Sequence, residues 1–405
     1  MRFRLNLAAA LLAAAVIWAG PAAAQDADPL LQRPRQLEKE GRRQEALNAY
    51  HEIFRQHAGR DPEAAARALY EGGKYALERF PTNEVEKRQG QDTAAQWWKQ
   101  VVLEYPGTQA ARELGGLRDD GQFMKLAMEI SRRNSSDWKY QLLDGLVKLC
   151  GNNPAYSYGL ALVLLAVLVK IILLPLTKKQ YASMREMQRM QPLVKALQAK
   201  YKGPELNQKM MELYREHGVN PLAGCLPMML QLPFLILVFG AIREYEFAFL
   251  KGKFLWIGSA ASYGSPPFMG GPLLGRNLAE PDVPLLTMYA LTNYITMKLT
   301  PATDPQQQQT QNMMAVMTTV IFFYMFLVNR WSSAFVLYWF ALNLLSIWQQ
   351  YEYVYKPHKE RLATNGAGAP TAQANGAGAA EAEAEARPVA KPRPPARVKP
   401  RKKRK

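Results

Sequence analysis

The chain has 405 residues, of which 48% are hydrophobic and 21% are charged, and its formal net charge at pH 7 is +17. Two cysteines and four scattered histidines exclude a disulfide-built domain and argue against a structural zinc site. Long apolar runs lie within residues 156–355, while charged residues collect before and after them. This segregation excludes a single soluble domain, and the length predicts two to three domains.

The positive charge is concentrated in two segments. Residues 25–137 carry 18 basic and 19 acidic side chains, whereas residues 177–224 carry nine basic and four acidic ones. Residues 356–405 carry 13 basic and four acidic side chains. Such basic segments favour a polyanionic neighbour, and anionic lipid and RNA are the two candidates.

Residues 1–24 are typical of a secretory signal peptide. Arg2 and Arg4 precede an apolar core, and three alanines before Gln25 form a small-residue cleavage site. An uncleaved first span is the alternative. Under either interpretation the chain from Gln25 onward is expected to lie outside the cytoplasm.

Residues 25–120 are predicted to form an extracytoplasmic helical domain that resembles a tetratricopeptide array. The run from Gly41 to Tyr50 has the spacing G-x-x-x-x-A-L-x-x-Y, and later helices combine small residues with large aromatic ones. At most two or three imperfect units are visible. A peptide-binding repeat and a small helical bundle without a ligand therefore both stay open, and the partner of this domain is unknown.

The segment 121–155 is predicted to be an amphipathic helix that lies on the outer membrane surface. Apolar residues from Phe123 onward are mixed with basic residues such as Lys125 and Arg132, and a second apolar group follows Trp138. An ordinary globular helix is the alternative. The membrane interpretation is favoured because an apolar segment follows directly.

Five apolar segments within residues 156–355 are predicted to cross a membrane. They are Tyr156–Leu176, Cys225–Arg243, Val283–Leu299, Met313–Val328 and Phe335–Tyr351. Two are slightly short for a hydrocarbon layer of ~30 Å, which a thinned bilayer or a tilted bundle would accommodate. The positive-inside rule places the connector 177–224 and the tail 356–405 in the cytoplasm, opposite the N-terminal domain.

The connector 177–224 is predicted to be a cytoplasmic hairpin of two methionine-rich helices with a turn at Gly203-Pro204. Methionine surfaces suit varied apolar partners, although packing between the two helices accounts for many of these residues. The candidate contact residues of the hairpin are Lys178, Lys179, Arg185, Met187, Arg189 and Met190. The expected fold class is thus all-α: a five-span membrane core with a cytoplasmic helical hairpin, joined to a soluble helical domain.

The tail 356–405 has low complexity and is predicted to be disordered. It ends in a basic cluster composed of Arg401, Lys402, Lys403, Arg404 and Lys405. The charge alone is consistent with a role in fixing the topology and with contact to ribosomal RNA or lipid headgroups.

Lys170 is the most informative residue of the predicted core. It interrupts an otherwise aliphatic run, and a charge near the centre of a bilayer costs at least ~2.5–3.5 kcal/mol. Its spacing is consistent with snorkelling to the inner headgroups and with a water-filled cavity that opens to the cytoplasm. Polar residues in the other segments favour the cavity. No acidic residue lies deep in any predicted span, which argues against a proton-coupled or cation-coupled transporter.

Three motifs resemble the core of the YidC/Oxa/Alb superfamily of membrane protein insertases. Leu174-Pro175-Leu176-Thr177-Lys178-Lys179-Gln180 is similar to its start, and Asn220-Pro221-Leu222-Ala223-Gly224-Cys225-Leu226-Pro227 with Gln231-Leu232-Pro233 is similar to its second signature. Leu337-Tyr338-Trp339 with Asn343 and Gln349-Gln350 is similar to the last span. The resemblance covers residues 156–355 in order but neither the N-terminal domain nor the tail.

The resemblance implies a multi-pass insertase in the bacterial inner membrane, with a hydrophilic groove that is open to the cytoplasm and to lipid. The family carries one basic residue in this groove, usually arginine, and Lys170 occupies that position. The further groove residues expected from it are Gln231, Asn293 and Ser346, with Tyr338 and Trp339 along the wall.

The resemblance also implies the partners of the protein. They are nascent membrane proteins, the lipid bilayer, the Sec translocon and the ribosome. The sequence contains neither a Gly-rich phosphate loop nor an evident nucleophile–base pair, so no enzymatic chemistry, cofactor or metal is expected. A small-molecule transporter and a membrane-anchored repeat adaptor are the alternative functions.

Overall fold

The computed structural model describes residues 28–78, 83–217, 226–268, 271–299 and 305–356. The regular secondary structure of these residues is helical, apart from one antiparallel pair of two-residue strands, β1 (Pro267–Phe268) and β2 (Gly271–Pro272). The all-α fold class predicted from the sequence is confirmed. The predicted signal peptide and almost all of the basic tail lie outside the described residues.

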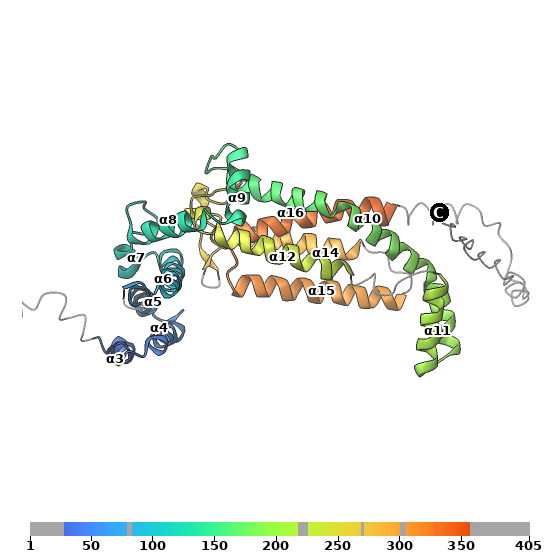
Figure 1. Ribbon diagram of the computed structural model, residues 1–405, viewed down its shortest axis with the longest axis horizontal. Coiled ribbons are helices and arrows are strands. Elements are labelled where there is room, and N and C mark those ends of the chain that lie inside the picture. Colours follow the sequence, from blue (N-terminus) through green and yellow to red (C-terminus); the bar gives the residue numbers. More distant parts are fainter. Residues whose placement is uncertain (1–27, 79–82, 218–225, 269–270, 300–304, 357–405) are drawn as a thin grey trace, which may run out of the picture. The chain divides into compact units, whose positions relative to one another are not determined.

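The N-terminal domain begins with a short 3-10 helix, Pro29–Leu31, and continues with five α-helices (Figure 1). These are α3 (Gln32–Lys39), α4 (Arg43–His57), α5 (Pro62–Glu78), α6 (Glu84–Glu104) and α7 (Gln109–Glu113). Asp61 caps α5, because its Oδ1 atom accepts a hydrogen bond of 3.1 Å from the Ala64 amide. Asn83 caps α6 in the same way, accepting from the Glu86 amide at 2.9 Å.

Close packing of α4, α5 and α6 depends on small residues that face aromatic ones. Tyr50 of α4 and Trp98 of α6 are buried. A Cβ atom on Gly73 of α5 would lie only 2.4 Å from Trp98 Nε1, and one on Gly72 would lie 2.8 Å from Tyr50 Cβ. The glycines therefore let the helices approach more closely than any larger residue allows.

The segment expected to be one interfacial helix instead forms α8 (Gln122–Asn134) and α9 (Trp138–Leu149). Helix α8 packs against α6 and buries Phe123 and Ile130 inside the protein, so its apolar face is not available to a membrane. Helix α9 packs against two core helices, yet Trp138 and Leu149 are 57% and 75% exposed. Met128 of α8 is 38% exposed, but α9 exposes more apolar surface and fits an interfacial helix better.

Five core helices run side by side (Figure 1), as the predicted spans require. They are α10 (Ser157–Lys200), α12 (Leu226–Glu244), α14 (Val283–Lys298), α15 (Pro305–Val328) and α16 (Ser333–Gln350). Helix α16 packs against α10, α12 and α14, and α15 packs against α14. By length and composition, two described helical stretches are able to cross a membrane, Ser157–Ala182 and Gln309–Val328. Membrane crossing by the other three helices stays a prediction.

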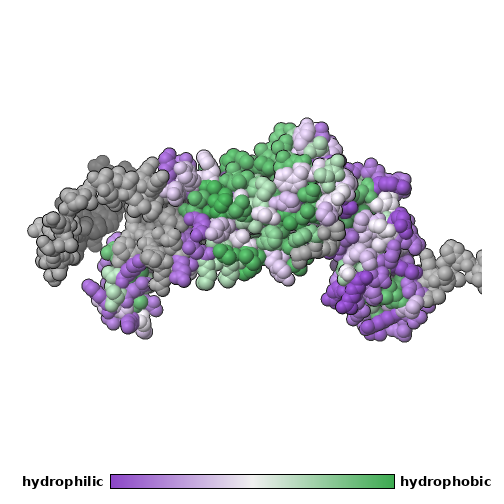
Figure 2. Space-filling model, turned by 180° about the vertical axis from the view of Figure 1, so that it is seen from behind, coloured by the Kyte–Doolittle hydropathy of each residue, from purple (hydrophilic) through white to green (hydrophobic). Residues whose placement is uncertain are grey.

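The surface of the core matches a lipid environment. Figure 2 shows hydrophobic residues gathered over the middle of the molecule, with hydrophilic surface on either side. Large apolar side chains that are exposed on the core helices include Ile171, Ile236, Leu291, Ile321 and Trp348. Contiguous apolar exposure of this extent is unusual for a soluble protein and is expected for a membrane one.

The first predicted span and the first helix of the predicted hairpin are one continuous element. Helix α10 has 44 residues, which corresponds to about 66 Å at ~1.5 Å per residue. This length exceeds a hydrocarbon layer of ~30 Å, so part of α10 must extend beyond it. The second hairpin helix, α11 (Gly203–Glu216), begins at the predicted turn and has Pro204 in its first turn.

Shorter elements connect α12 to α14. They are a 3-10 helix, Ala248–Leu250, the helix α13 (Ala260–Tyr263) and the two strands. A π-helical turn, Tyr351–Tyr355, follows α16. There the Tyr353 ring stacks on Tyr181 of α10, with 6.1 Å between the ring centroids.

We expect Gly73→Ala to destabilise the N-terminal domain by about 1–3 kcal/mol, because the added methyl group overlaps the rigid indole of Trp98. Gly145→Ala is the matched control. Gly145 is also helical, but its added Cβ meets nothing within 4 Å. The control should be neutral or slightly stabilising. Thermal unfolding of the detergent-solubilised protein, followed by tryptophan fluorescence, measures both changes, and equal shifts for the two variants would contradict the packing argument.

Candidate functional site

Lys170 of α10 points towards α16 and forms two hydrogen bonds there. Its Nζ atom donates to Ser346 Oγ at 2.7 Å and to Gln349 Oε1 at 3.2 Å. Ser346 and Gln349 are three residues apart, so they are neighbours on the surface of one helix. The half-buried ammonium is therefore held inside the helical bundle.

Both partners of Lys170 are neutral. The Ser346 hydroxyl donates to the Leu342 carbonyl at 2.7 Å, which leaves its oxygen free to accept from Lys170. Gln349 is only 3% exposed, and its amide oxygen supplies the second acceptor. Within the described part of the chain, Lys170 has no ion pair with a carboxylate. The site thus contains a positive charge that is hydrogen-bonded but not neutralised.

A line of polar side chains extends from this position along α16. Trp339, Asn343, Ser346 and Gln350 follow one another at spacings of four, three and four residues, so they share one face of the helix. We call these four residues the polar face of α16. Trp339 Nε1, Asn343 Nδ2 and Gln350 Oε1 are buried and have no hydrogen-bond partner among the described residues. Buried polar atoms of this kind require water or a polar ligand.

The other predicted groove residues have different surroundings. Asn293 of α14 donates a long hydrogen bond of 3.4 Å to Thr319 Oγ1 of α15, so it joins two helices. Tyr338 is 3% exposed and belongs to the buried core. Trp339 packs on Phe335, with 6.0 Å between the ring centroids. Gln231 lies on α12, but its side chain is outside the described residues.

The candidate contact residues of the hairpin are only partly described. The Lys178 ammonium lies 5.8 Å from the centre of the Tyr353 ring, which suits a cation–π contact. Lys179 is exposed, whereas Met190 is buried within the protein. The side chains of Arg185, Met187 and Arg189 lie outside the described residues, as does the basic cluster 401–405.

Gln349 is a site residue that sequence reasoning did not select. The sequence does contain an indication of it, because Gln349 and Gln350 are two adjacent amide residues that follow a strongly apolar run. Helical periodicity shows that they cannot face the same direction, since neighbours on a helix are ~100° apart. Only the packing of α16 against α10 determines which of the two reaches Lys170.

Comparison with known proteins identifies the family of the core. Residues 150–361, just over half of the chain, match the family model described as 60Kd inner membrane protein. A relative from Fusobacterium nucleatum, named membrane protein insertase YidC, is 35% identical over 216 residues. That alignment covers 52% of this chain and 90% of the relative.

Two further relatives with the same name are longer proteins. Those from Pelobacter propionicus and Syntrophobacter fumaroxidans are 37% and 39% identical over 198 and 205 residues. Each alignment covers 48% of this chain and 34% of the relative, so the chain spans about a third of the length of these relatives. The resemblance inferred from the sequence motifs is confirmed, and the chain belongs to the YidC family of inner membrane proteins.

Proposed function

We propose that the protein is a membrane protein insertase, which transfers hydrophilic segments of nascent membrane proteins along a hydrophilic groove that is open to the cytoplasm and to lipid and is lined by Lys170 and the polar face of α16. The observation that carries the proposal is the Lys170 ammonium, which is held inside the bundle by two neutral acceptors. The name shared by the relatives supports the same activity.

The charge of Lys170 gives the groove its selectivity for acidic segments. Two opposite unit charges 4 Å apart attract each other by about 4 kcal/mol at an effective dielectric constant of 20. When an acidic residue of the substrate approaches Lys170, this attraction offsets part of the free energy that the loss of its hydration costs. Because Ser346 and Gln349 carry no charge, they hold the ammonium in place without neutralising it.

The polar face of α16 supplies hydrogen bonds along the proposed path. Trp339 Nε1 and Asn343 Nδ2 are donors, and Gln350 Oε1 is an acceptor, so together they match the two polar groups of a peptide backbone. Water or a substrate segment that satisfies these atoms lowers the cost of moving polar groups through the membrane. The apolar helix of the substrate then moves into lipid, and its burial drives the step. No covalent chemistry is needed.

The proposed orientation places the N-terminal domain outside and the C-terminus in the cytoplasm. The basic connector and the basic tail support it through the positive-inside rule. In this orientation the hairpin residues Lys178 and Lys179 and the cluster 401–405 are available to the ribosome, to anionic lipid or to the Sec translocon. The first 24 residues act as the signal for export of the N-terminal domain.

The two alternative functions have less support. A coupled transporter usually requires a carboxylate within the membrane, and none of the five predicted spans contains Asp or Glu away from its ends. A repeat adaptor that is merely anchored would not need a buried lysine or a line of unpaired polar atoms on a core helix.

We expect Lys170→Met to reduce insertion of a substrate with an acidic translocated segment about tenfold, the equivalent of ~1.4 kcal/mol. Lys170→Arg should retain most of the activity, because it keeps the charge. Insertion is measured in proteoliposomes as protease protection of the translocated segment. Lys125→Met, which removes an exposed charge from α8, is the matched control. Equal insertion of acidic and neutral segments by wild type and Lys170→Met would exclude the proposed role of the charge.

We expect Gln349→Leu to destabilise the core by about 1–3 kcal/mol, because the ammonium loses one of its two acceptors. In a Lys170→Met background the same substitution should cost clearly less, since no charge is left to satisfy. Thermal unfolding midpoints of the four proteins in this double-mutant cycle, measured in detergent, give the coupling between the two side chains. Identical losses in both backgrounds would show that the hydrogen bond does not stabilise the site.

A further inference from the structure

The N-terminal domain is attached to the outer ends of two core helices through helix α6. On the α12 side, Lys99 forms an ion pair with Glu246, which follows the end of α12. Gln96 Nε2 donates to the other carboxylate oxygen of Glu246 at 2.9 Å. The Lys99 and Glu246 side chains are only 16% and 18% exposed, so this contact is largely shielded from water.

Electrostatics favour the ionised form of this carboxyl group. Burial alone would raise the pKa of Glu246, but Lys99, Gln96 and the nearby Arg243 act in the opposite direction and hold it below its usual value. A carboxyl group with a lowered pKa in the folded protein stabilises the fold at neutral pH. This stabilisation disappears as the pH falls through the lowered pKa. The Glu246 carboxyl group is therefore ionised at neutral pH, as its ion pair with Lys99 requires.

On the α16 side, the end of α6 makes two contacts. Glu104 forms an ion pair with Arg330, which lies in the turn just before α16. The Leu103 carbonyl accepts a hydrogen bond of 2.6 Å from Arg276. Arg276 also pairs at 2.7 Å with Glu280, whose side chain is 1% exposed. The end of α6 is thus fixed to the turn before α16 and to the segment 276–280.

The segment 276–280 in turn fixes the first residues of α16. The Glu280 carbonyl accepts from the Ser333 amide at 2.8 Å and from the Ser333 hydroxyl at 2.5 Å. The Leu278 carbonyl accepts from the Ala334 amide at 2.8 Å. These bonds satisfy backbone groups that the start of a helix leaves unpaired. A connected set of polar contacts therefore runs from α6 to the beginning of α16.

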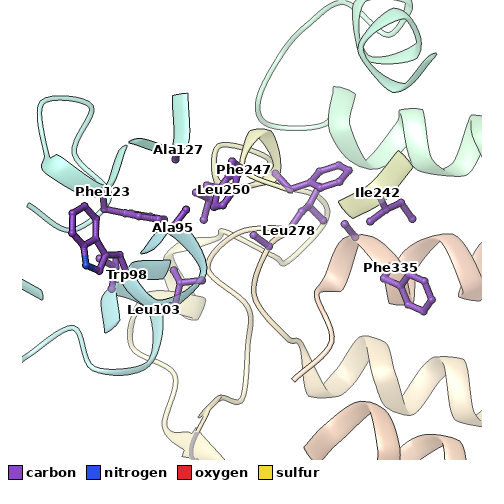
Figure 3. Close-up of a cluster of buried hydrophobic side chains, with 14 of the residues drawn as sticks. Ala95, Trp98, Leu103, Phe123, Ala127, Ile242, Phe247, Leu250, Leu278 and Phe335 are labelled. Carbon is purple, nitrogen blue, oxygen red and sulfur yellow. The ribbon is translucent and has the colours of Figure 1, made fainter. Parts of the chain in front are cut away.

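Apolar packing supports the same connection (Figure 3). The buried cluster combines residues of the N-terminal domain and α8 with residues of the connectors, α12 and α16. Its members include Trp98, Leu103, Phe123, Ile242, Phe247, Leu250, Leu278 and Phe335. The rings of Phe123 and Phe247 meet edge to face with 6.4 Å between their centroids. Burial of these side chains supplies stability, and the ion pairs fix the direction of approach.

We propose that helix α6 positions α16 against α10, so that the N-terminal domain is a structural part of the insertion site and not an independent module. This inference rests on the proposed function. Ser333 and Ser346 are 13 residue steps apart on the stiff helix α16, about 20 Å at ~1.5 Å per residue. A shift of its outer end is therefore transmitted to Ser346 and Gln349. Because the groups of a functional site must be held within ~0.5 Å of their productive geometry, such a shift weakens the hydrogen bonds that Lys170 makes with its acceptors.

Charge reversal of the Glu104–Arg330 pair tests the proposal in the full-length protein. Glu104→Arg and Arg330→Glu each place two like charges in a largely buried contact, and the double variant restores an opposite pair. We expect each single variant to reduce insertion of an acidic segment at least fivefold, and the double variant to return within twofold of wild type. Arg33→Glu reverses a charge in an exposed pair between α3 and α4 and should have no effect.

A second readout reports the position of α16 independently of insertion. Tyr181 and Tyr353 stack between α10 and the turn after α16, so cysteines at these two positions should be joined by a bifunctional thiol-reactive crosslinker. Cys150→Ser and Cys225→Ser provide the background. The single charge reversals should reduce the crosslinking yield, and the double variant should restore it.

The two readouts separate this inference from the proposed function. If the crosslinking yield falls in the single charge reversals and returns in the double variant, the result supports the positioning of α16 by α6, even if the protein inserts no substrate. Full crosslinking and full insertion in both single variants would overturn the inference, as would a double variant worse than either single one. Glu104→Gln is a milder variant that removes the charge without placing two like charges together. It should lower the crosslinking yield less than the charge reversals do, and it tests the pair even if the reversed variants misfold.

Discussion

The arrangement of the core depends on keeping one ammonium group of a membrane helix away from lipid. A charge on α10 is costly in hydrocarbon unless it finds polar partners, and Ser346 and Gln349 of α16 are those partners. Both are uncharged. A carboxylate in their place would neutralise the lysine, and the attraction that we propose for acidic segments of a substrate would be lost. The contact between α10 and α16 thus holds the ammonium group in place and leaves its charge free to interact with an anionic group.

The polar face of α16 extends this principle along the helix. Trp339, Asn343 and Gln350 have buried polar atoms without partners, which is unfavourable in a finished protein interior. The opposite sides of the core helices expose large apolar residues such as Ile171 and Ile321, as lipid contact requires. The core is thus polar within the bundle and apolar on its surface. This arrangement suits transient contact with the polar segments of a protein that is being moved from one aqueous compartment to another.

Helix α6 of the N-terminal domain makes largely buried polar contacts with the core. Helix α6 reaches α12 through Glu246 and reaches the start of α16 through Arg330 and Arg276. These polar contacts are surrounded by a shared apolar cluster. The stiff α16 connects this outer contact with the acceptors of Lys170, which gives the domain a mechanical role in the site. The N-terminal domain lies outside the part of the chain that matches the family. A positioning role depends on the contacts that the domain makes with the core, so it does not require a particular fold of the domain.

The sequence by itself determined the helical class, the positions of the core helices, the family and the presence of one lysine, Lys170, within an apolar run. These features follow from local periodicity, from the cost of a charge in an apolar run and from motifs that are contiguous in the chain. Tertiary structure decided that Gln349 and not Gln350 reaches Lys170, that Asn293 bonds to α15, and that α8 buries the apolar face expected on the membrane. It also decided that α10 is one continuous helix and that α6 holds the start of α16. Each of these outcomes depends on which faces of distant helices meet, and that information is absent from the spacing of residues along one segment.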